Sequence, residues 1–536
     1  MTLHLTASGP RAWHRVGAVH ARGLAFTPEG DYVEGAALAA HLDGPAETFV
    51  ERIAALDGTF AAVHTGGTTI AAVDRIRSLP LFYGRDDTGT WHLSDDARRI
   101  AKLTAARLDD AAAAAEFMLQ NATTGPTTLS SSVRQVQAGE AVTLGAAEPT
   151  GTRYYRYGDA PLIDAPEEEL IEEGTRLFER AFERFLTSVR GRTVVVPLSG
   201  GMDSRLIAAM LVRGGRTDAL CFSYGRERSF EARASRRVAE TLGLSWTFVP
   251  YSNRQWHRWV ASESYQRYRR TATGLTGIEH EQDWPAVLTL KERGLPDDAT
   301  FVPGHAGDFL GGSHLPDTPT EFEHDPVTWI WRRYYNEWPT HALHPSLTDV
   351  LRRRIADHLD GAADLDGAAD PVRSFLRFGW QERQAKMIAN SIRVYEHHGA
   401  DWRLPFWSDS AVLDFWGRLP VPLLRRRRLY FRVLRRLMGD DLFDLPSTLR
   451  RELPLAGKLR RLLDPNHGRY GIWLGPYPMI SALTTRVGDV ARVEHPVIGS
   501  VVEQCARPIA NRPLPWATIN GLLALDQLRD LSRELG

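Results

Sequence analysis

A glycine- and serine-rich segment, "LSGGMDS", occupies residues 198–204, directly after a short apolar run. Backbone N–H groups at the start of a helix bind anions, and glycines let the backbone approach an anion closely. Ser199 and Ser204 add hydroxyl donors. A mononucleotide phosphate loop has Lys-Ser or Lys-Thr after its last glycine, which this segment lacks. We therefore expect a loop that holds pyrophosphate as a leaving group, with Asp203 binding Mg²⁺.

The elements that position this loop alternate between strand and helix patterns, from about residue 192 onward. Short apolar runs alternate with longer amphipathic runs, which predicts a β-α-β-α-β unit and a parallel, doubly wound α/β sheet. The predicted loop joins the first strand to the first helix. The five expected elements are 193–198 (strand), 204–214 (helix), 218–224 (strand), 230–243 (helix) and 245–251 (strand).

Residues 1 to about 155 have a different, β-rich pattern. Two hairpins are expected, at 58–75 around a Gly-Gly turn and at 80–96 around a polar turn. Helical patterns occur at about 36–42 and 109–120. A stretch rich in glycine and proline predicts a linker at 145–165. A long amphipathic helix is expected at 167–186, and the last third of the chain reads as mostly helical.

Composition excludes several classes of function. The 536-residue chain has a formal net charge of −1, which argues against general capture of nucleic acid. Cys221 and Cys505 are its two cysteines, so neither a disulfide framework nor a CxxC zinc site is expected. No apolar run reaches the ~18 residues of a membrane span, and no signal-peptide pattern is visible. We expect a cytoplasmic protein with no membrane partner. Lysine is rare, at positions 102, 291, 386 and 458.

The segment at 198–204 resembles the pyrophosphate (PP) loop of the N-type ATP pyrophosphatases. Further likeness at 301–316 ("FVPGHAGDFLGGSHLP") and, more loosely, at 382–420 narrows the resemblance to the asparagine synthetase-like family. That family includes asparagine synthetases, β-lactam synthetases and lasso peptide cyclases. The resemblance implies an Ntn-hydrolase-like αββα sandwich over residues 1–155. It also implies a Rossmann-like adenine nucleotide α-hydrolase synthetase domain over residues 160–536, with a helical C-terminal portion.

The same resemblance implies the nucleotide and metal ligands. Asp203 and Asp308 are the expected Mg²⁺ ligands, and two carboxylates with phosphate oxygens and waters form an ordinary Mg²⁺ site. Phe309 stands where asparagine synthetases carry Glu. The residues expected at ATP are Leu198, Ser199, Gly200, Gly201, Asp203, Ser204, Ser223, Tyr224 and Gly304.

Catalytic residues follow from the resemblance as well. His305 occupies the slot of the family's general base, and an imidazole accepts a proton near neutral pH. Glu396 is expected to orient that base. Lys458 is the expected late lysine that stabilises the acyl-adenylate, with Lys386 or an arginine as alternatives. Three further residues are candidate substrate ligands or members of a salt-bridged surface: Arg393, Arg403 and Asp409.

The N-terminal half lacks the signals of glutamine hydrolysis. Family members that hydrolyse glutamine begin Met-Cys-Gly, whereas this chain begins "MTLHL", and no Arg-Gly-Pro-Asp segment is present. Thr2 remains an alternative nucleophile. We expect an inactive glutaminase-type scaffold, so that nitrogen arrives as ammonia, as an amine, or as an amine on the same substrate.

Together these features predict an ATP-dependent, AMP-forming carbon–nitrogen ligase that uses ATP and Mg²⁺. It would adenylate a small-molecule or peptide carboxylate and couple it to a nitrogen nucleophile, in specialised-metabolite or polysaccharide biosynthesis. Three alternatives stay open: a lasso-type macrolactam cyclase, a sulfur- or nitrogen-inserting enzyme acting on tRNA, and a catalytically silent nucleotide-binding homologue. The oligomeric state is also open, and a homodimer is one expectation.

Overall fold

The computed structural model describes ten segments of the chain. Every structural statement below concerns these residues, which are 1–6, 11–145, 148–225, 229–315, 325–338, 340, 343–359, 370–447, 497–506 and 519–535. Within them, none of the helices combines the length and apolarity needed to cross a membrane.

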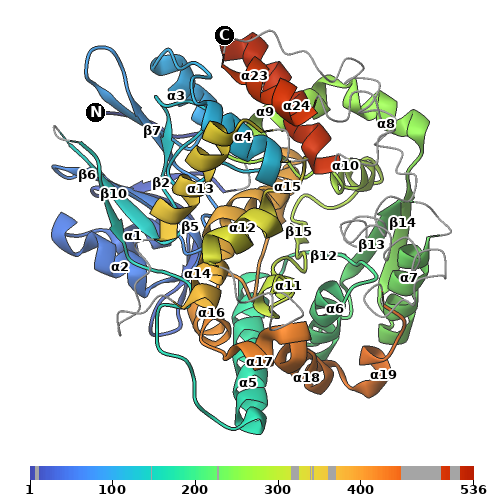
Figure 1. The fold of residues 1–536 in the computed structure, drawn as a ribbon. Coiled ribbons are helices and arrows are strands. Elements are labelled where there is room, and N and C mark those ends of the chain that lie inside the picture. Colours follow the sequence, from blue (N-terminus) through green and yellow to red (C-terminus); the bar gives the residue numbers. More distant parts are fainter. Residues whose placement is uncertain are drawn as a thin grey trace.

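A seven-stranded antiparallel sheet forms the outer part of the N-terminal half (Figure 1), in the order β11-β10-β6-β5-β3-β2 with β4 beside β3. Alternate residues of β5 face opposite sides, as the pleat requires. Phe60 and Ala62 pack into a small core with α1 and α2, whereas Ala61 and Val63 face the main core. The elements are β2 His14–Val16, β3 Val19–Phe26, β4 Tyr32–Glu34, β5 Asp57–His64, β6 Thr69–Val73, β10 Glu140–Leu144, β11 Thr150–Arg153, α1 Ala36–Leu42 and α2 Phe49–Ala55.

A four-stranded sheet, in the order β1-β8-β7-β9, completes this half, and α3 contacts it. Both predicted hairpins are confirmed, as β5–β6 and β7–β8. The Ntn-hydrolase likeness of the two sheets stays a prediction. The elements are β1 Thr2–His4, β7 Phe82–Arg85, β8 Trp91–Ser94, β9 Arg134–Gln135, α3 Ala97–Leu103 and α4 Ala111–Gln120.

The predicted linker is partly wrong. Thr150–Arg153 forms β11, which pairs antiparallel with β10 and extends the seven-stranded sheet. Its glycine and threonine residues suit an exposed edge strand as well as a loop, so composition alone did not separate the two structures. The long helix predicted next is confirmed as α5, Glu167–Ser188, with Glu167, Glu168 and Glu169 in its first turn.

A five-stranded parallel sheet organises the second half and confirms the predicted β-α-β-α-β unit and the α/β class. Its order is β14-β13-β12-β15-β16. The chain passes from β12 outward to β13 and β14, while β15 lies on the other side of β12. The strand order therefore reverses between β12 and β15, and ligands of such sheets bind at the carboxyl ends of the strands at that point. The elements are β12 Val194–Pro197, β13 Leu220–Gly225, β14 Ser245–Pro250, β15 Thr300–Phe301, β16 Asp401–Trp402, α6 Asp203–Arg213 and α7 Phe230–Leu242.

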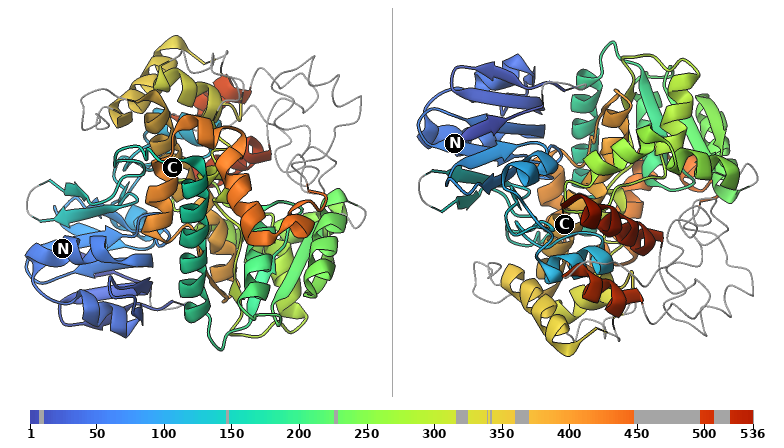
Figure 2. Two further views of the ribbon diagram at one scale, coloured as in Figure 1. Left: turned by 90° about the horizontal axis from the view of Figure 1, so that it is seen from below. Right: turned by 90° about the horizontal axis from the view of Figure 1, so that it is seen from above.

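Most of the other regular elements of the described chain are helices. The C-terminal helices α23 and α24 return to the N-terminal half and contact α4 (Figure 2). The helices are α8 Asn253–Val260, α9 Glu263–Ala272, α10 Trp284–Glu292, α11 Gly307–Leu310, α12 Pro326–Tyr334, α13 Pro345–Leu359, α14 Pro371–Phe378, a π-helix Gly379–Ile388, α15 Arg393–His397, α16 Ser410–Gly417, α17 Val421–Leu424, α18 Arg428–Met438, α19 Asp440–Phe443, α23 Ile498–Ala506 and α24 Ile519–Leu535.

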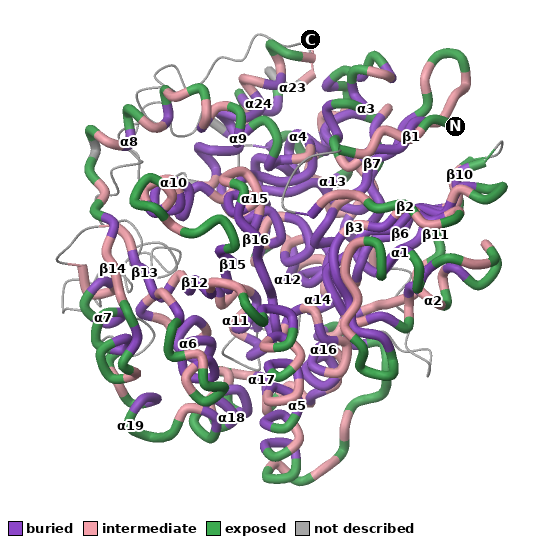
Figure 3. The backbone as a smooth tube through the Cα atoms, turned by 180° about the vertical axis from the view of Figure 1, so that it is seen from behind, coloured by how far each residue is buried: buried purple, intermediate pink, exposed green. Residues whose placement is uncertain are grey.

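The main hydrophobic core is continuous through the centre of the molecule (Figure 3). It joins Val73 and Leu93 of the N-terminal sheets to Val195 of β12 and Leu525 of α24. Apolar packing therefore crosses residue 155, and the division into domains 1–155 and 160–536 stays a prediction.

Candidate active site at the β12–β15 switch point

The loop after β12 lies at the carboxyl end of that strand. Its two serines hold the loop together, because Ser204 Oγ accepts from Ser199 N–H at 3.0 Å and Ser199 Oγ accepts from Gly201 N–H at 3.1 Å. No side chain caps the N-terminus of α6, the 11-residue helix that follows. A helix end of this kind carries unpaired N–H groups and partial positive charge. The loop therefore has the donors of an anion site.

A carboxylate already accepts a hydrogen bond from this loop. Glu231, in the first turn of α7, receives the N–H of Gly200. Burial raises the pKa of Glu231. An acidic group thus occupies one donor of the loop, as the positive end of the helix predicts.

The second motif packs directly on the first. A Cβ added at Gly304 would lie 2.6 Å from the backbone nitrogen of Ser204 and 2.8 Å from the carbonyl carbon of Asp203. Ala306, next to the first turn of α11, has a left-handed backbone with φ of +66°. Glycine at 304 is thus required for close contact between the two loops, which brings Asp308 toward Asp203. The contact expected between Gly304 and a nucleotide stays a prediction.

Asp203 and Asp308 form a pair of interacting carboxylates. Burial, and then the negative charge of Asp308, raise the pKa of Asp203 to about 7. Tyr430 of α18 donates to Asp203 Oδ1 at 2.7 Å. No three His, Cys, Asp or Glu side chains converge on one point in the described chain. The pair fits a hard cation that takes its other ligands from phosphate and water, because Mg²⁺ usually uses one or two carboxylates.

His305 belongs to the second motif, and its hydrogen bond to Ser391 determines which ring nitrogen carries the proton. Ser391 donates its single hydroxyl proton to the carbonyl of Ile388 at 2.5 Å. Ser391 Oγ must therefore accept from His305 Nε2–H, at 2.8 Å. Burial, and then the nearby His280, lower the pKa of His305 to about 4. His305 is thus a neutral imidazole at pH 7, with Nδ1 as the nitrogen that accepts a proton.

The expected pairing of Glu396 with His305 is wrong. Glu396 Oε2 accepts from Arg393 and Oε1 accepts from the indole of Trp402. The charge of Arg393 lowers the pKa of Glu396 in spite of its burial. Ser391 takes the place that sequence reasoning gave to Glu396. A serine next to a π-helix carries no sequence signal that it will reach a residue 86 positions away.

The three candidate substrate ligands also belong to the scaffold. Arg393 contacts the carbonyl of Ser78 as well as Glu396. Arg403 pairs with Asp401 and donates to the carbonyl of Ser188. Asp409 caps α16 and accepts from Arg180 and Arg184. Their charges are used in ion pairs within the protein, which favours the salt-bridge alternative, and a role in substrate binding stays a prediction.

The lysine predictions have different outcomes. Lys458 lies outside the described residues. Lys386, its alternative, is buried and donates to the carbonyls of Thr123 and Gly125 and to Glu382. With its three ammonium protons in these bonds, Lys386 has none left for an adenylate.

Two other residues expected to contact the nucleotide, Ser223 and Tyr224, lie at the end of β13. Ser223 is buried, whereas Tyr224 is half-buried at the end of β13. The Tyr224 ring stacks on Tyr251 with centroids 5.1 Å apart, and its hydroxyl donates to Asp283. Asp283 also accepts from Tyr395 at 2.6 Å. Leu198 is buried and bonds to β13 through its N–H, so its side chain belongs to the core.

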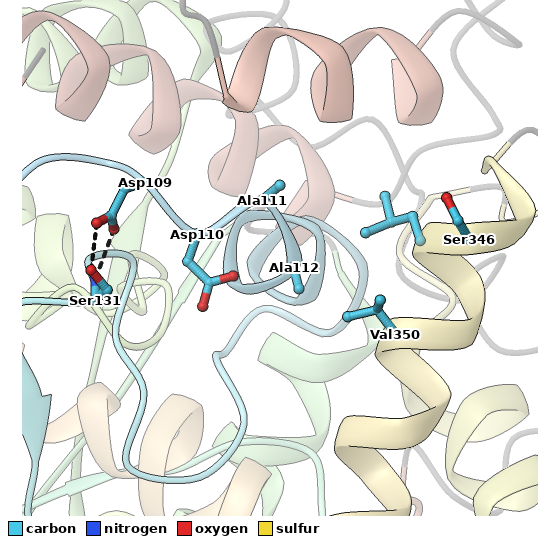
Figure 4. A pocket seen from close by; sticks show the side chains of 8 residues that line it. Asp109, Asp110, Ala111, Ala112, Ser131, Ser346 and Val350 are labelled. Carbon is cyan, nitrogen blue, oxygen red and sulfur yellow. Dashed lines mark hydrogen bonds between the residues drawn. The ribbon is translucent and has the colours of Figure 1, made fainter.

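A separate surface pocket of about 510 Å³ lies between α4 and α13 (Figure 4). Its two carboxylates are already paired. Asp109 accepts from the N–H and hydroxyl of Ser131, and Asp110 accepts from Arg354 and caps α4. None of its lining residues belongs to the two motifs. The pocket is therefore not the candidate active site.

Comparisons with known proteins bear on the second half of the chain. No curated protein matches the sequence. Among solved structures, the ammonia-dependent NAD synthetase of Campylobacter jejuni, in complex with the nitrate ion, matches with 13% identity. The matched region covers 36% of this chain and 95% of the NAD synthetase chain, with a TM-score of 0.21. A family model described as asparagine synthase matches residues 174–449. This match includes both loops, the two carboxylates and His305, and the chain belongs to the asparagine synthase family.

Proposed function

We propose that this protein is an ATP-dependent, AMP-forming ligase that joins a carboxylate to a nitrogen nucleophile. The observation that carries the proposal is the close packing of the two loops that bear Asp203 and Asp308, beside an uncapped helix N-terminus, where the strand order of the parallel sheet reverses. Membership of the asparagine synthase family supports ATP use and ligation in general. The identity of the acid, the nitrogen donor and the pathway, in specialised-metabolite or polysaccharide biosynthesis, belongs to the proposal.

In the first half-reaction a carboxylate oxygen of the substrate attacks the α-phosphorus of ATP. The bond from that phosphorus to the bridging oxygen breaks, and pyrophosphate leaves as an acyl-adenylate forms. The N–H groups of the uncapped first turn of α6, next to the loop, would hold the departing phosphates. Asp203 and Asp308 would hold Mg²⁺, which, when bound, neutralises phosphate charge.

In the second half-reaction the nitrogen nucleophile attacks the acyl carbon and AMP leaves. A proton must be removed from the attacking nitrogen. His305 Nδ1 is the nitrogen left as acceptor by the bond from Nε2 to Ser391. We assign the proton transfer to this atom. The proposal includes use of ammonia or an amine without glutamine hydrolysis, because the N-terminal half lacks the cysteine signature.

The proposal is tested by identifying the products of ATP and by following an ¹⁸O label from the carboxylic acid. Purified protein with MgATP, ammonia or amines, and a panel of carboxylic acids should release pyrophosphate and AMP. An acid labelled with ¹⁸O should transfer one labelled oxygen to AMP. His305→Gln should retain ATP–pyrophosphate exchange but lose amide formation. Release of ADP and orthophosphate, or unlabelled AMP, would contradict the proposal. Binding of MgATP without exchange, for any acid, would favour the silent homologue.

A further inference from the structure

The corner between α17 and α18 has an unusual backbone. Two consecutive non-glycine residues, Arg426 and Arg427, have left-handed conformations with φ of +52° and +59°. Such a conformation costs of order 1 kcal/mol or more for each residue, and persists where surrounding contacts fix it. The corner is therefore held in place by its neighbours.

Glycines of the second motif supply those contacts. A Cβ on Gly312 would lie 2.7 Å from the carbonyl oxygen of Leu424, and one on Gly311 would lie 2.9 Å from the ring of Tyr430. A Cβ on Gly307 would lie 2.6 Å from the hydroxyl of Tyr430. Side chains at these three positions would push the corner away. The glycines thus let α17 and α18 approach the two carboxylates.

The corner brings one cation to the carboxylate pair. Arg427 NH2 lies 3.7 Å from Asp308 Oδ2, and the side chain is 14% exposed. That distance exceeds the 2.7–2.9 Å typical of a charge-assisted hydrogen bond. Its neighbours differ, because Arg426 is exposed and Arg428 pairs at the surface with Glu167. Within the described chain, the guanidinium of Arg427 is close to the site but makes no close hydrogen bond there.

We propose that Arg427 binds phosphate oxygens of the nucleotide, beside the cation held by Asp203 and Asp308. This inference rests on the proposed function and extends it to a residue outside both motifs. A guanidinium offers a planar fork of donors that matches two phosphate oxygens. Lys386 is fully engaged elsewhere, so Arg427 supplies positive charge at the site. Tyr430 acts as a positioning residue, since its hydroxyl holds Asp203 Oδ1.

The backbone of the corner provides a matched pair of variants. Glycine adopts the left-handed conformation without strain, so Arg427→Gly and Arg426→Gly both remove a side chain and relieve the backbone. Both variants are expected to fold, with thermal stability close to that of the unaltered protein. Titration calorimetry would use MgATP, magnesium pyrophosphate and adenosine as three separate probes.

Arg427→Gly should weaken magnesium pyrophosphate and MgATP binding by about ten-fold or more, the loss expected for charge-assisted hydrogen bonds. Adenosine binding should not change, because the probe has no phosphate. Arg426→Gly should bind all three probes like the unaltered protein. Arg427→Lys should bind the two phosphate-bearing probes with an affinity between those of Arg427→Gly and the unaltered protein, because lysine keeps the charge but lacks the planar fork of donors.

Two results would overturn the inference. One is unchanged binding of magnesium pyrophosphate by Arg427→Gly when the unaltered protein binds it. The other is equal weakening by Arg426→Gly, which would assign the effect to the backbone. Failure of the proposed function looks different: phosphate binding would depend on Arg427, yet no acid would support pyrophosphate exchange. An unaltered protein that binds neither phosphate probe would overturn both.

Discussion

Two groups of buried or half-buried carboxylates in this molecule have opposite electrostatics. Asp203 and Asp308 are close enough for their charges to interact, and the pKa of Asp203 is raised to about 7 by burial and by Asp308. At the contact between the two halves of the chain, Glu382 accepts from Lys386 and pairs with His358 at 2.7 Å. There the charges of Lys386 and His358 overcome the effect of burial and lower the pKa of Glu382.

The difference separates the proposed ligand site from a structural cluster. Around Glu382 the carboxylate itself has close partners in Lys386 and His358, and Gly125 donates to it at 2.9 Å. Around Asp203 and Asp308 two acidic groups interact, and the guanidinium of Arg427 lies 3.7 Å from Asp308. Like charges held together by a fold are stabilised by a bound cation. If the first group is the proposed site, a bound metal and nucleotide would relieve its repulsion, whereas the second group is already neutralised by its own partners.

The largest expected effect is the loss of the cation in the structural cluster. Lys386→Met leaves Glu382 buried without its ammonium partner and removes the ammonium donor to the Thr123 carbonyl, whereas the Gly125 carbonyl keeps its bond from Gln135. Breaking a buried pair costs about 3–5 kcal/mol of stability. Urea unfolding should show this loss. Lys291→Met, which removes a pair with the fully exposed Asp297, should change stability by less than about 1 kcal/mol. A loss of less than about 1 kcal/mol for Lys386→Met would contradict the structural role given to the Glu382 cluster.

At the proposed ligand site we expect the opposite pattern, in which a substitution leaves stability unchanged but weakens ligand binding. Asp203→Asn removes the repulsion with Asp308, so the protein without ligands should be at least as stable as before. Binding of MgATP should fall by about 100-fold, the upper part of the range found when groups at metal sites are removed. Thermal unfolding and titration calorimetry measure the two effects. A destabilised Asp203→Asn protein with normal MgATP binding would assign Asp203 to the scaffold.

A third test concerns the contact between the loops. Gly304→Ala places a methyl group 2.6 Å from a backbone nitrogen, which cannot move aside as a flexible side chain would. We expect a loss of about 1–3 kcal/mol in stability, together with weaker MgATP binding. Gly145→Ala is the control, because its nearest atom is 3.9 Å away, at Thr68 Cγ2. Equal effects of the two substitutions would show that the close approach at Gly304 has no role.

The smallest expected effect is on pH dependence. Because the pKa of Asp203 is raised from 3.8 to about 7, the folded protein holds an extra proton between these values. This contribution to stability is complete below about pH 4 and is lost as the pH rises to about 7. Glu382 has a lowered pKa, so its contribution is complete above its unfolded pKa of 4.5 and is lost as the pH falls below that value. Thermal unfolding of Asp203→Asn should show a flatter profile between pH 4 and 7.

Magnesium should reverse that slope. Metal binding requires a deprotonated carboxylate, so the stabilisation by Mg²⁺ with ATP should grow as the pH rises toward and past 7. The measurement is the shift in unfolding temperature at pH 5.5 and at pH 8. A shift independent of pH, or one retained by Asp203→Asn, would place the cation elsewhere.

Sequence reasoning succeeded where a local pattern determines the structure. The run before Ser199 and the helix after it predicted the strand–loop–helix unit, because apolar periodicity and glycine placement act within a few residues. The hairpins around residues 65–68 and 86–90 followed for the same reason. The edge strand at Thr150–Arg153 was missed, since its pairing with β10 depends on a partner strand and not on its own composition.

The sequence by itself determined the chemistry on offer: an anion-binding loop, two acidic residues and a histidine on a parallel α/β sheet. The tertiary structure decided which residues serve it. Ser391 reaches His305, Tyr430 reaches Asp203, and Glu396 and Lys386 turn to buried partners. The reason is physical. A pattern encodes contacts among neighbours in the chain, whereas each of these hydrogen bonds and ion pairs depends on where packing places distant segments.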